Sequence, residues 1–373
     1  METMQYISPA FSESKVAIGV SSSNEYAPFL SVFIKSIIEN SSEEKKYDII
    51  VFESSISDCN KKKLLSMINK KNISLRFFDP SYLFDENNLY ISHWYFKKEC
   101  YYRIASPVIL KNYDKVIYTD LDLVLQDDIL KLADIDLNGK AIAACKEVVW
   151  EDFINSKTKI MGIDIVEYST NILKLKDIST YFNTGVVVID IAKYNELNSF
   201  HNILEIVTQN KLLYQEQCGI NMFFNDRIHV LEHQWNFEIM PETTREMQYS
   251  FYMKALQHAK ILHFLGSGKP WFYPEFELCE MWWKYARTSP FYEEIIGRMV
   301  SHKSSHLIHS NIKEFRLSYV MNHPLSFIIK RLRYYLLKHI TSGDSKVMYQ
   351  QKYKAVSQLI RDAKKLRKQW TKF

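Results

Sequence analysis

Short apolar segments alternate with segments of helical periodicity through the first 280 residues, and few fold classes accommodate that alternation. The expected strands are residues 15–20, 47–53, 73–78, 115–119, 141–145, 182–190, 227–231 and 261–264, and helical patterns cover residues 26–40, 58–70 and 95–110. Most of these strands are apolar along almost their whole length, which is typical of sheets that helices cover on both faces. The pattern predicts an α/β fold, in which ligands bind beyond the carboxyl ends of the strands.

Charge divides the chain near residue 300. Residues 301–373 contain 16 Lys and Arg against 3 Asp and Glu, whereas residues 1–300 contain 32 against 40. A polar break, SHKSSHLIHS (301–310), precedes an amphipathic helical pattern over residues 323–340 and a basic helical pattern over residues 352–373. We therefore expect a main domain over residues 1–285 and a basic, aromatic helical region over residues 286–373.

Neither the cysteines nor the N-terminus indicates export. The five cysteines are scattered and include no CxxC pair, which favours reduced thiols in the cytoplasm. The first residues, METMQYISPAFSES, lack the basic and apolar regions of a signal peptide. No segment approaches the roughly 18 to 20 apolar residues of a spanning helix. The sequence predicts a cytoplasmic protein.

Two carboxylates follow the expected strand at residues 115–119. In VIYTDLDLVL (116–125), Asp120 and Asp122 are two positions apart, where they repel one another. Such a pair provides hard oxygen ligands for Mg²⁺ or Mn²⁺. The alternative is a solvent-exposed turn with a helix cap. A phosphatase of the haloacid dehalogenase type is another alternative, because DLDLV meets its loose DxDx[TV] pattern, in which the first Asp is the nucleophile.

A second polar segment follows the last expected strand. In ILHFLGSGKPWF (261–272), His263 ends the strand and offers an imidazole ligand to a metal, unless it is a structural histidine. Gly266 provides a turn whose backbone N–H groups can approach phosphate oxygens, and Lys269 adds a positive charge. Two further segments are less specific: Asn183 precedes a buried strand, and Glu216 and Gln217 begin a helical pattern, where they could also act as a helix cap.

Six segments together resemble glycosyltransferase family 8. They are NEYAPFLSVFIKSI, YYRIASPVIL, YTDLDLVLQDDI, YFNTGVVVIDIAKY, QEQCGINMFF and HFLGSGKPW, and the resemblance covers about residues 14 to 285. It implies a GT-A fold, which is a Rossmann-like mixed sheet flanked by helices. It also implies transfer of a hexose from a nucleotide sugar with retention of configuration. By motif position, Asp120, Asp122 and His263 would ligate Mn²⁺ or Mg²⁺, and Lys269 with Gly266 would hold the diphosphate.

The resemblance also assigns the sugar side of the site. Arg103 and Asn183 would contact the donor sugar or position its neighbours. Glu216 and Gln217 match a DQD-like triplet whose Gln lies beneath the anomeric carbon. Gln217 is a poor nucleophile, so we favour attack by the acceptor on the same face that the nucleotide leaves. The implied partners are UDP-galactose or UDP-glucose and a glycan or glycolipid acceptor, as in lipopolysaccharide synthesis.

Three positions depart from the family pattern. Ser23, with Tyr26 nearby in the donor site, stands where many members have an acidic residue that reads uracil. Cys218 replaces the last carboxylate of the triplet, and Thr184 replaces the usual small residue. A non-catalytic sugar-binding relative is therefore a further alternative.

The basic tail has two interpretations. An amphipathic basic helix can bind the anionic inner face of the plasma membrane, and each basic residue then contributes about 1 kcal/mol of binding free energy. It can equally pack on the main domain with its basic face in solvent. No nucleic-acid recognition motif accompanies it, so we expect no nucleic-acid partner.

Overall fold

The computed structural model describes residues 4–85, 88–91, 97–157, 159–160, 162–239, 255–276, 278–303, 324–340 and 342–370. It divides into two compact units, residues 1–297 (unit 1) and 298–373 (unit 2). This boundary is later than the one expected after residue 285, because Phe291 and Ile295 are buried.

A seven-stranded sheet forms the centre of unit 1, in the order β10-β6-β9-β4-β1-β2-β3. Its strands are β1 (Val16–Ser21), β2 (Tyr47–Phe52), β3 (Ile73–Phe78), β4 (Lys115–Thr119), β6 (Ile142–Lys146), β9 (Phe182–Asp190) and β10 (His229–Val230). All of them run parallel except β9, which is antiparallel to both β4 and β6. The expected mixed α/β sheet is confirmed.

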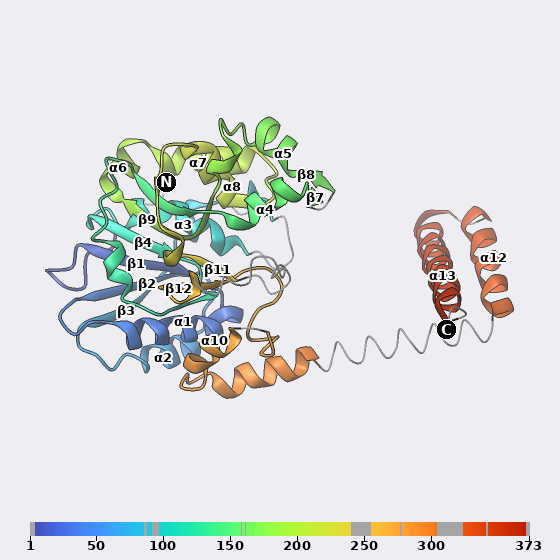
Figure 1. Ribbon diagram of the computed structural model, residues 1–373. Helices are drawn as coiled ribbons and strands as arrows, with labels where there is room; N and C mark the ends of the chain where they lie inside the picture. Colours follow the sequence, from blue (N-terminus) through green and yellow to red (C-terminus); the bar gives the residue numbers. More distant parts are fainter. Residues whose placement is uncertain are drawn as a thin grey trace. The chain divides into compact units, whose positions relative to one another are not determined.

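Helices cover both faces of this sheet (Figure 1). One face carries α1 (Ala27–Asn40), α2 (Asp58–Leu65) and α10 (Cys279–Ala286), and the other carries α3 (Tyr102–Ile109), α6 (Ile191–Glu196), α7 (Ser199–Gln209) and α8 (Gln215–Phe224). Every residue of β2 and all but the last residue of β9 are buried. Two-sided burial is therefore the reason that these strands are apolar without alternation.

A small sheet with the order β11-β12-β5 joins two distant segments. Its strands are β5 (Leu123–Leu125), β11 (Phe237–Ile239) and β12 (Ile261–Phe264). β12 pairs antiparallel with β5, with His263 opposite Leu123, and the Phe264 amide donates to the Asp122 carbonyl at 3.0 Å. This pairing carries His263 to the acidic pair. Unit 1 also contains α4 (Val148–Ser156), β7 (Lys159–Ile160), β8 (Ile163–Asp164) and α5 (Ile165–Glu167).

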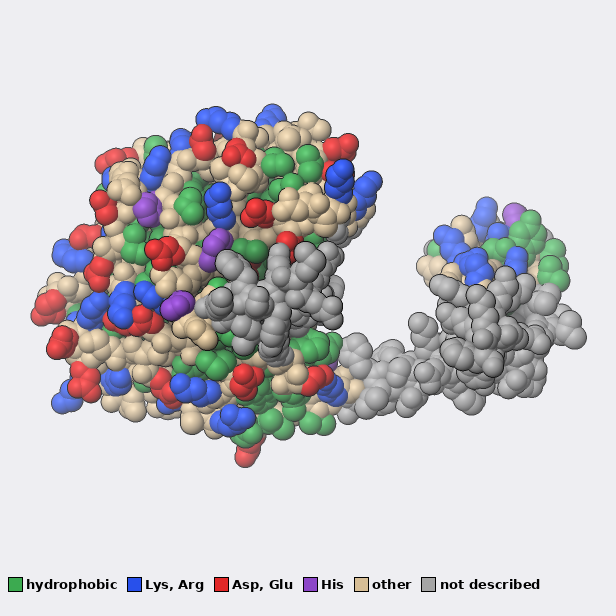
Figure 2. Space-filling model, viewed as in Figure 1, with side chains coloured by type: hydrophobic (Ala, Val, Ile, Leu, Met, Phe, Trp, Pro, Cys, Tyr) green, Lys and Arg blue, Asp and Glu red, His purple; other side chains and the backbone are tan. Residues whose placement is uncertain are grey.

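Within the described residues 324–340 and 342–370 of unit 2, the helices α12 (Pro324–Ile340) and α13 (Gly343–Trp370) contact each other. Tyr334 stacks on Tyr349, and the Lys338 ammonium lies 4.3 Å from the centre of the Tyr353 ring. Acidic and basic side chains are intermixed on the visible face of unit 1, whereas the coloured part of unit 2 is mainly basic and hydrophobic (Figure 2). No helix within the described ranges has the length and apolar character needed to cross a membrane.

Candidate active site

One cleft in unit 1 collects every site residue expected from the sequence. Its cavity volume is about 310 Å³. It is lined by Ser23, Tyr26, Arg103, Asp120, Asp122, Asn183, Glu216, Gln217, His263, Gly266 and Lys269. The topology explains why they meet: β1 and β4 end at the same sheet edge where the antiparallel β9 begins, so residues 21–23, 119–122 and 183 converge. The cleft lies beyond the carboxyl ends of the parallel strands, as α/β sheets generally place it.

Three potential ligands for a metal ion come together in this cleft. Asp120, Asp122 and His263 each offer one atom, and these atoms lie within 4.8 Å of one another. The Nε2 atom of His263 is 3.2 Å from Asp122 Oδ1 and 3.7 Å from Asp120 Oδ2. Two carboxylates and an imidazole form a ligand set that suits Mn²⁺ and related divalent ions. The cluster joins a segment after β4 to strand β12, as the sequence predicts.

Two atoms of this cluster are buried without a hydrogen-bond partner. They are Asp122 Oδ1 and His263 Nε2, and His263 is only 1% exposed. Nearly all buried polar atoms in folded proteins have a hydrogen-bond partner, so two facing atoms that lack one need an explanation. A cation between them would give each atom a partner. The residues present therefore fit a divalent metal.

Lys269 adds a positive charge beside the cluster. Its ammonium donates to Asp122 Oδ2 and to the Phe264 carbonyl, the latter at 2.6 Å. Burial alone would raise the pKa of Asp122, but the Lys269 ammonium beside it holds that pKa well below its usual range. The turn before the lysine depends on Gly266, whose φ of 67° lies in the left-handed region. Asp122 is thus kept ionised in a partly buried position.

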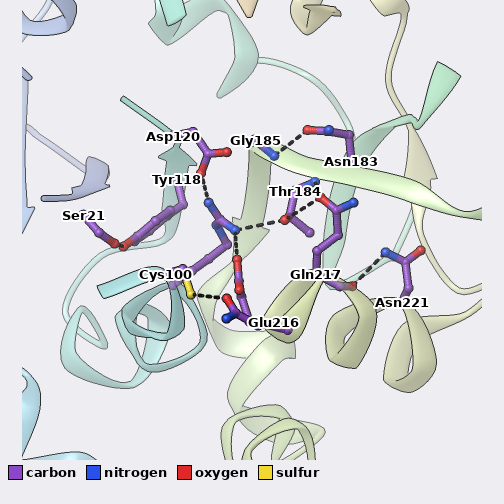
Figure 3. Close-up of polar contacts among 12 residues, drawn as sticks. Ser21, Cys100, Tyr118, Asp120, Asn183, Thr184, Gly185, Glu216, Gln217 and Asn221 are labelled. Atoms are coloured by element: carbon purple, nitrogen blue, oxygen red, sulfur yellow. Dashed lines mark hydrogen bonds and ion pairs between the residues drawn. The ribbon is translucent and has the colours of Figure 1, made fainter. Parts of the chain in front are cut away.

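The opposite wall of the cleft is organised around the guanidinium of Arg103. It donates to Thr184 Oγ1 at 2.9 Å, to Glu216 Oε1 at 2.7 Å and to Asp120 Oδ1. Figure 3 shows Asp120, Thr184 and Glu216 converging from three different elements. Burial raises the pKa of Glu216 despite the nearby guanidinium, while Asp120 and Glu216 raise the pKa of Arg103 against its own burial. Arg103 therefore connects Asp120 of the candidate metal cluster with Glu216 in the first turn of α8.

Gln217 is fixed on the same helix by contacts to both ends of its amide. Its Oε1 accepts from the Thr184 amide at 3.1 Å and from the Thr184 hydroxyl at 3.2 Å. Its Nε2 donates to Glu147 Oε2 at 3.1 Å and to the Tyr181 hydroxyl at 3.3 Å. Four hydrogen bonds hold this amide in one orientation at the cleft wall.

Comparison with known proteins identifies the architecture. The family model described as glycosyl transferase family 8 matches residues 17–275. The chain belongs to glycosyltransferase family 8. General stress protein A of Bacillus subtilis (strain 168) is 23% identical over 259 residues, which are 66% of this chain and 84% of that protein. The family assignment gives the phosphatase interpretation of DLDLV no support.

Two solved structures show the fold of this family member. The WbbM bifunctional glycosyltransferase matches with a TM-score of 0.70 and 26% identity over 79% of this chain and 53% of that chain. This chain thus spans about half the length of WbbM. The galactosyltransferase LgtC, solved with donor and acceptor sugar analogues, matches with a TM-score of 0.59 and 20% identity over 74% of this chain and 96% of that chain. The GT-A fold and the glycosyltransferase class expected from the sequence are confirmed.

Two departures from the family 8 pattern have a structural explanation. Cys218 is fully buried, and its sulfur is 3.2 Å from the Tyr181 hydroxyl, so this position faces the core rather than the cleft. Thr184 does more than fill space, because its hydroxyl contacts both Arg103 and Gln217.

The third departure concerns Ser23. Its hydroxyl oxygen is buried without a hydrogen-bond partner, although the residue lines the cleft. The neighbouring Asn24 accepts from the Ser57 amide and from Asn60 Nδ2, both at 2.9 Å, so its oxygen is engaged near the start of α2. Tyr26 also lines the cleft, and burial raises its pKa to about 12. Of the two side chains at 23 and 24, the serine is the one left to meet a ligand.

Sequence reasoning missed two polar residues near the ligands. Glu147 lines the cleft directly after β6, so the rule that sites follow strands could have found it. Asn236 contacts His263 Nδ1 and precedes β11, a strand of three residues that is too short to leave a periodic signal. Its role emerges only from the folded arrangement.

Proposed function

We propose that the chain transfers a hexose from UDP-galactose or UDP-glucose to a glycan or glycolipid acceptor, with retention of configuration and with Mn²⁺ or Mg²⁺. A role in bacterial lipopolysaccharide or another surface glycan fits this chemistry. The observation that carries the proposal is the pair of buried, unpartnered atoms on Asp122 and His263, next to Asp120 and Lys269. A cleft that is ready for a cation and a diphosphate suits a nucleotide-sugar donor.

Each wall of the cleft would have its own task. A sugar–diphosphate bond breaks with negative charge developing on the leaving phosphate and positive charge at the anomeric carbon. When bound by Asp120, Asp122 and His263, a divalent ion supplies Lewis-acid stabilisation of the leaving phosphate. The Lys269 ammonium, which lies against Asp122 in the ligand-free chain, would turn to the same phosphate oxygens and add fixed electrostatic stabilisation.

Retention would come from same-face attack. Gln217 lines the cleft, but its oxygen already accepts two hydrogen bonds from Thr184, and an amide is a weak nucleophile. Glu216 is engaged by Arg103, and Glu147 Oε2 accepts from two amides. With the Gln217 amide and the Glu216 carboxylate engaged in this way, the acceptor hydroxyl would attack the face that the nucleotide leaves, and the departing phosphate would take its proton.

A donor screen tests the proposal. Purified full-length protein is incubated with UDP-galactose, UDP-glucose and GDP-mannose, with and without Mn²⁺, and nucleotide release is followed. We expect release from a UDP-hexose that depends on the metal and an axial product when an acceptor glycan is added. Nucleotide release that continues after the metal has been chelated would contradict the metal-dependent proposal. A covalent sugar adduct on Gln217, Glu216 or Glu147, detected by mass spectrometry, would contradict same-face attack.

Ser23 would determine which nucleobase of the donor the cleft accepts. Its unpartnered hydroxyl can both donate and accept, so it can pair with the polar edge of uracil without the charge of an acidic residue. The variant Ser23→Ala is expected to raise the KM for the UDP-sugar several-fold and to leave kcat nearly unchanged, since the base does not react. Equal KM values for serine and alanine would remove this assignment.

We further propose that unit 2 binds an anionic membrane surface at the inner face of the plasma membrane. Arg331 and Lys338 of α12 contact Tyr353 of α13, yet Leu332 and Leu336 on α12 are 57% and 61% exposed. Basic side chains beside exposed leucines suit a surface of acidic lipid head groups.

Vesicle sedimentation can separate the contribution of charge to membrane binding from that of apolar contact. Full-length protein should sediment with phosphatidylglycerol vesicles, and the double variant L332S/L336S should bind several-fold more weakly at equal net charge. Added salt should weaken both proteins, because screening acts on the basic residues. The double variant V347S/M348S, which removes two exposed apolar side chains from the other helix, α13, is the matched control. Vesicle binding that is equal with and without acidic lipid would contradict the proposal.

A further inference from the structure

A chain of buried side chains leads away from the imidazole of His263. Its Nδ1 lies 2.9 Å from Asn236 Oδ1, and Asn236 Nδ2 donates to Asn183 Oδ1 at 2.9 Å. Asn183 Nδ2 then donates to Glu147 Oε2 at 2.7 Å. All four residues are more than nine-tenths buried. The chain starts at the candidate metal ligand and ends on a carboxylate that also receives the amide of Gln217.

A backbone contact fixes the direction of every hydrogen bond in this chain. The oxygen and nitrogen of an amide side chain are distinguished by their partners rather than by shape. The Gly185 amide donates to Asn183 Oδ1 at 2.6 Å, and a backbone N–H cannot accept, so this atom of Asn183 is the oxygen. The atom of Asn236 that faces it must then be the NH₂ group. The oxygen of Asn236 therefore faces His263.

The direction of the chain determines which nitrogen of the imidazole carries the proton. Because Asn236 Oδ1 can only accept, His263 Nδ1 must be the donor. A neutral imidazole has one N–H, so Nε2 keeps its lone pair, and Nε2 is the buried atom that faces Asp122 Oδ1. Two lone pairs 3.2 Å apart repel each other unless a cation lies between them.

We propose that Asn236 is a positioning residue, which with Asn183 and Glu147 behind it holds His263 in the Nδ1–H tautomer and so presents Nε2 to a divalent cation. The cation belongs to the proposed function, whereas the tautomer is a property of the metal-free chain. An acceptor on the far nitrogen commonly orients a histidine ligand and raises its basicity. Here the acceptor is an amide, and the carboxylate of Glu147 lies two residues further along.

The same chain refines the role of Asn183. Its oxygen accepts from both Gly185 and Asn236, and its nitrogen donates to Glu147. Asn183 therefore positions its neighbours through three contacts. Because Glu147 Oε2 receives Asn183 and Gln217 together, one carboxylate aligns the metal ligand and the amide at the sugar side.

Nitrogen NMR of metal-free protein with labelled histidine tests the tautomer directly. At about pH 8.5, we expect the His263 signals of a protonated Nδ1 and a bare Nε2. The variant H263Q identifies those signals by their loss. An Nε2–H tautomer, or an imidazolium with both nitrogens protonated at that pH, would overturn the proposal.

The affinity for Mn²⁺ provides the second arm of the test. Titration calorimetry with Mn²⁺ alone should give roughly 10- to 100-fold weaker binding for N236L, which removes the acceptor, than for the wild type. N236D, whose carboxylate still accepts from Nδ1–H, should keep the tautomer and bind within a few-fold of the wild type. N72A is the matched control, because Asn72 is also buried and bonds the Ser42 and Lys45 carbonyls away from the cleft.

The two arms distinguish this inference from the proposed function. If N236L binds Mn²⁺ as tightly as N72A, Asn236 is not a positioning residue and the proposed function is unaffected. If the wild type binds no Mn²⁺, the proposed function fails, and the NMR spectrum still decides the tautomer. Should N236L fail to fold, the wild-type spectrum and the N236D titration still confirm or refute the inference.

Discussion

The two walls of the cleft contain similar charges but differ in how those charges are satisfied. On the arginine wall, Arg103 contacts Asp120, Glu216 and Thr184, so every charged group there has a partner within the chain. On the metal wall, Asp122 Oδ1 and His263 Nε2 face each other with no partner. The charged groups of the first wall are thus paired within the chain, whereas the second leaves two facing atoms for the proposed cation.

This difference separates residues that hold the fold from residues that hold a ligand. Breaking a buried ion pair leaves a charge without its partner, which costs stability. Removing one member of an unsatisfied cluster costs little stability and removes a binding site. The contrast therefore predicts that variants on the arginine wall lose stability and activity together, whereas substitutions of the candidate metal ligands on the metal wall lose activity alone.

The largest expected effect is on the arginine wall. Arg103→Met leaves Glu216 buried without its cation, and we expect the free energy of unfolding to fall by about 3–5 kcal/mol, measured by urea denaturation. The double variant R103M/E216M removes both charges and should regain most of that stability while remaining inactive. If R103M unfolds at the wild-type urea midpoint, Arg103 is not the structural centre of this wall.

A substitution on the metal wall should affect activity alone. Asp122→Asn should reduce metal-dependent transfer by roughly 10²- to 10³-fold, because the proposed divalent cation would lose one of its charged ligands. Its free energy of unfolding should change by no more than about 1 kcal/mol. The matched control is D127N, which alters a nearby carboxylate that is paired with Lys131 outside the cleft lining. Equal activity of the two variants would refute the division between the walls.

The glycine behind His263 tests how closely the metal wall is packed. A Cβ atom at Gly185 would lie 2.2 Å from His263 Cε1 and 2.8 Å from Asn183 Oδ1. Gly185→Ala should therefore destabilise the protein by about 1–3 kcal/mol and weaken Mn²⁺ binding in a titration. Gly297→Ala is the control, since a Cβ there meets no atom within 4 Å. Unchanged metal affinity in G185A would mean that the imidazole can move without consequence.

The smallest effect concerns pH. The Lys269 ammonium holds the pKa of Asp122 below its usual range against the effect of burial. Stability from this group is thus present above the unfolded pKa of about 3.9 and is lost as pH falls below it. Metal-free wild type should lose on the order of 1 kcal/mol more than D122N between about pH 5 and pH 3, as thermal unfolding would measure. Parallel pH profiles would show that the carboxylate gains nothing from Lys269.

Long apolar strands made the central fold predictable from sequence. β2, β3, β4, β9 and β12 lie within one residue of the expected segments, since burial on both faces leaves continuous apolar runs. The three-residue strands β5 and β11 were missed, because such short strands carry no period. They pair with β12 and bring His263 beside Asp122, so the site's geometry depends on the elements with the weakest signal.

The site was predictable where a single residue type implies one chemistry. Asp120, Asp122 and Lys269 carry charges that few structural roles require after a strand. Asn236 is different, because an asparagine is common and its importance lies in a contact to a histidine 27 residues away. Sequence therefore indicated the candidate ligands but not the hydrogen-bond chain behind His263.

Anomalous diffraction from a crystal grown with Mn²⁺ and UDP would locate the proposed metal site directly. We expect a single strong manganese peak between Asp122 Oδ1 and His263 Nε2, with Asp120 as the third ligand and Lys269 turned toward the diphosphate. A peak away from these three side chains, or UDP bound in the cleft without manganese at them, would contradict it.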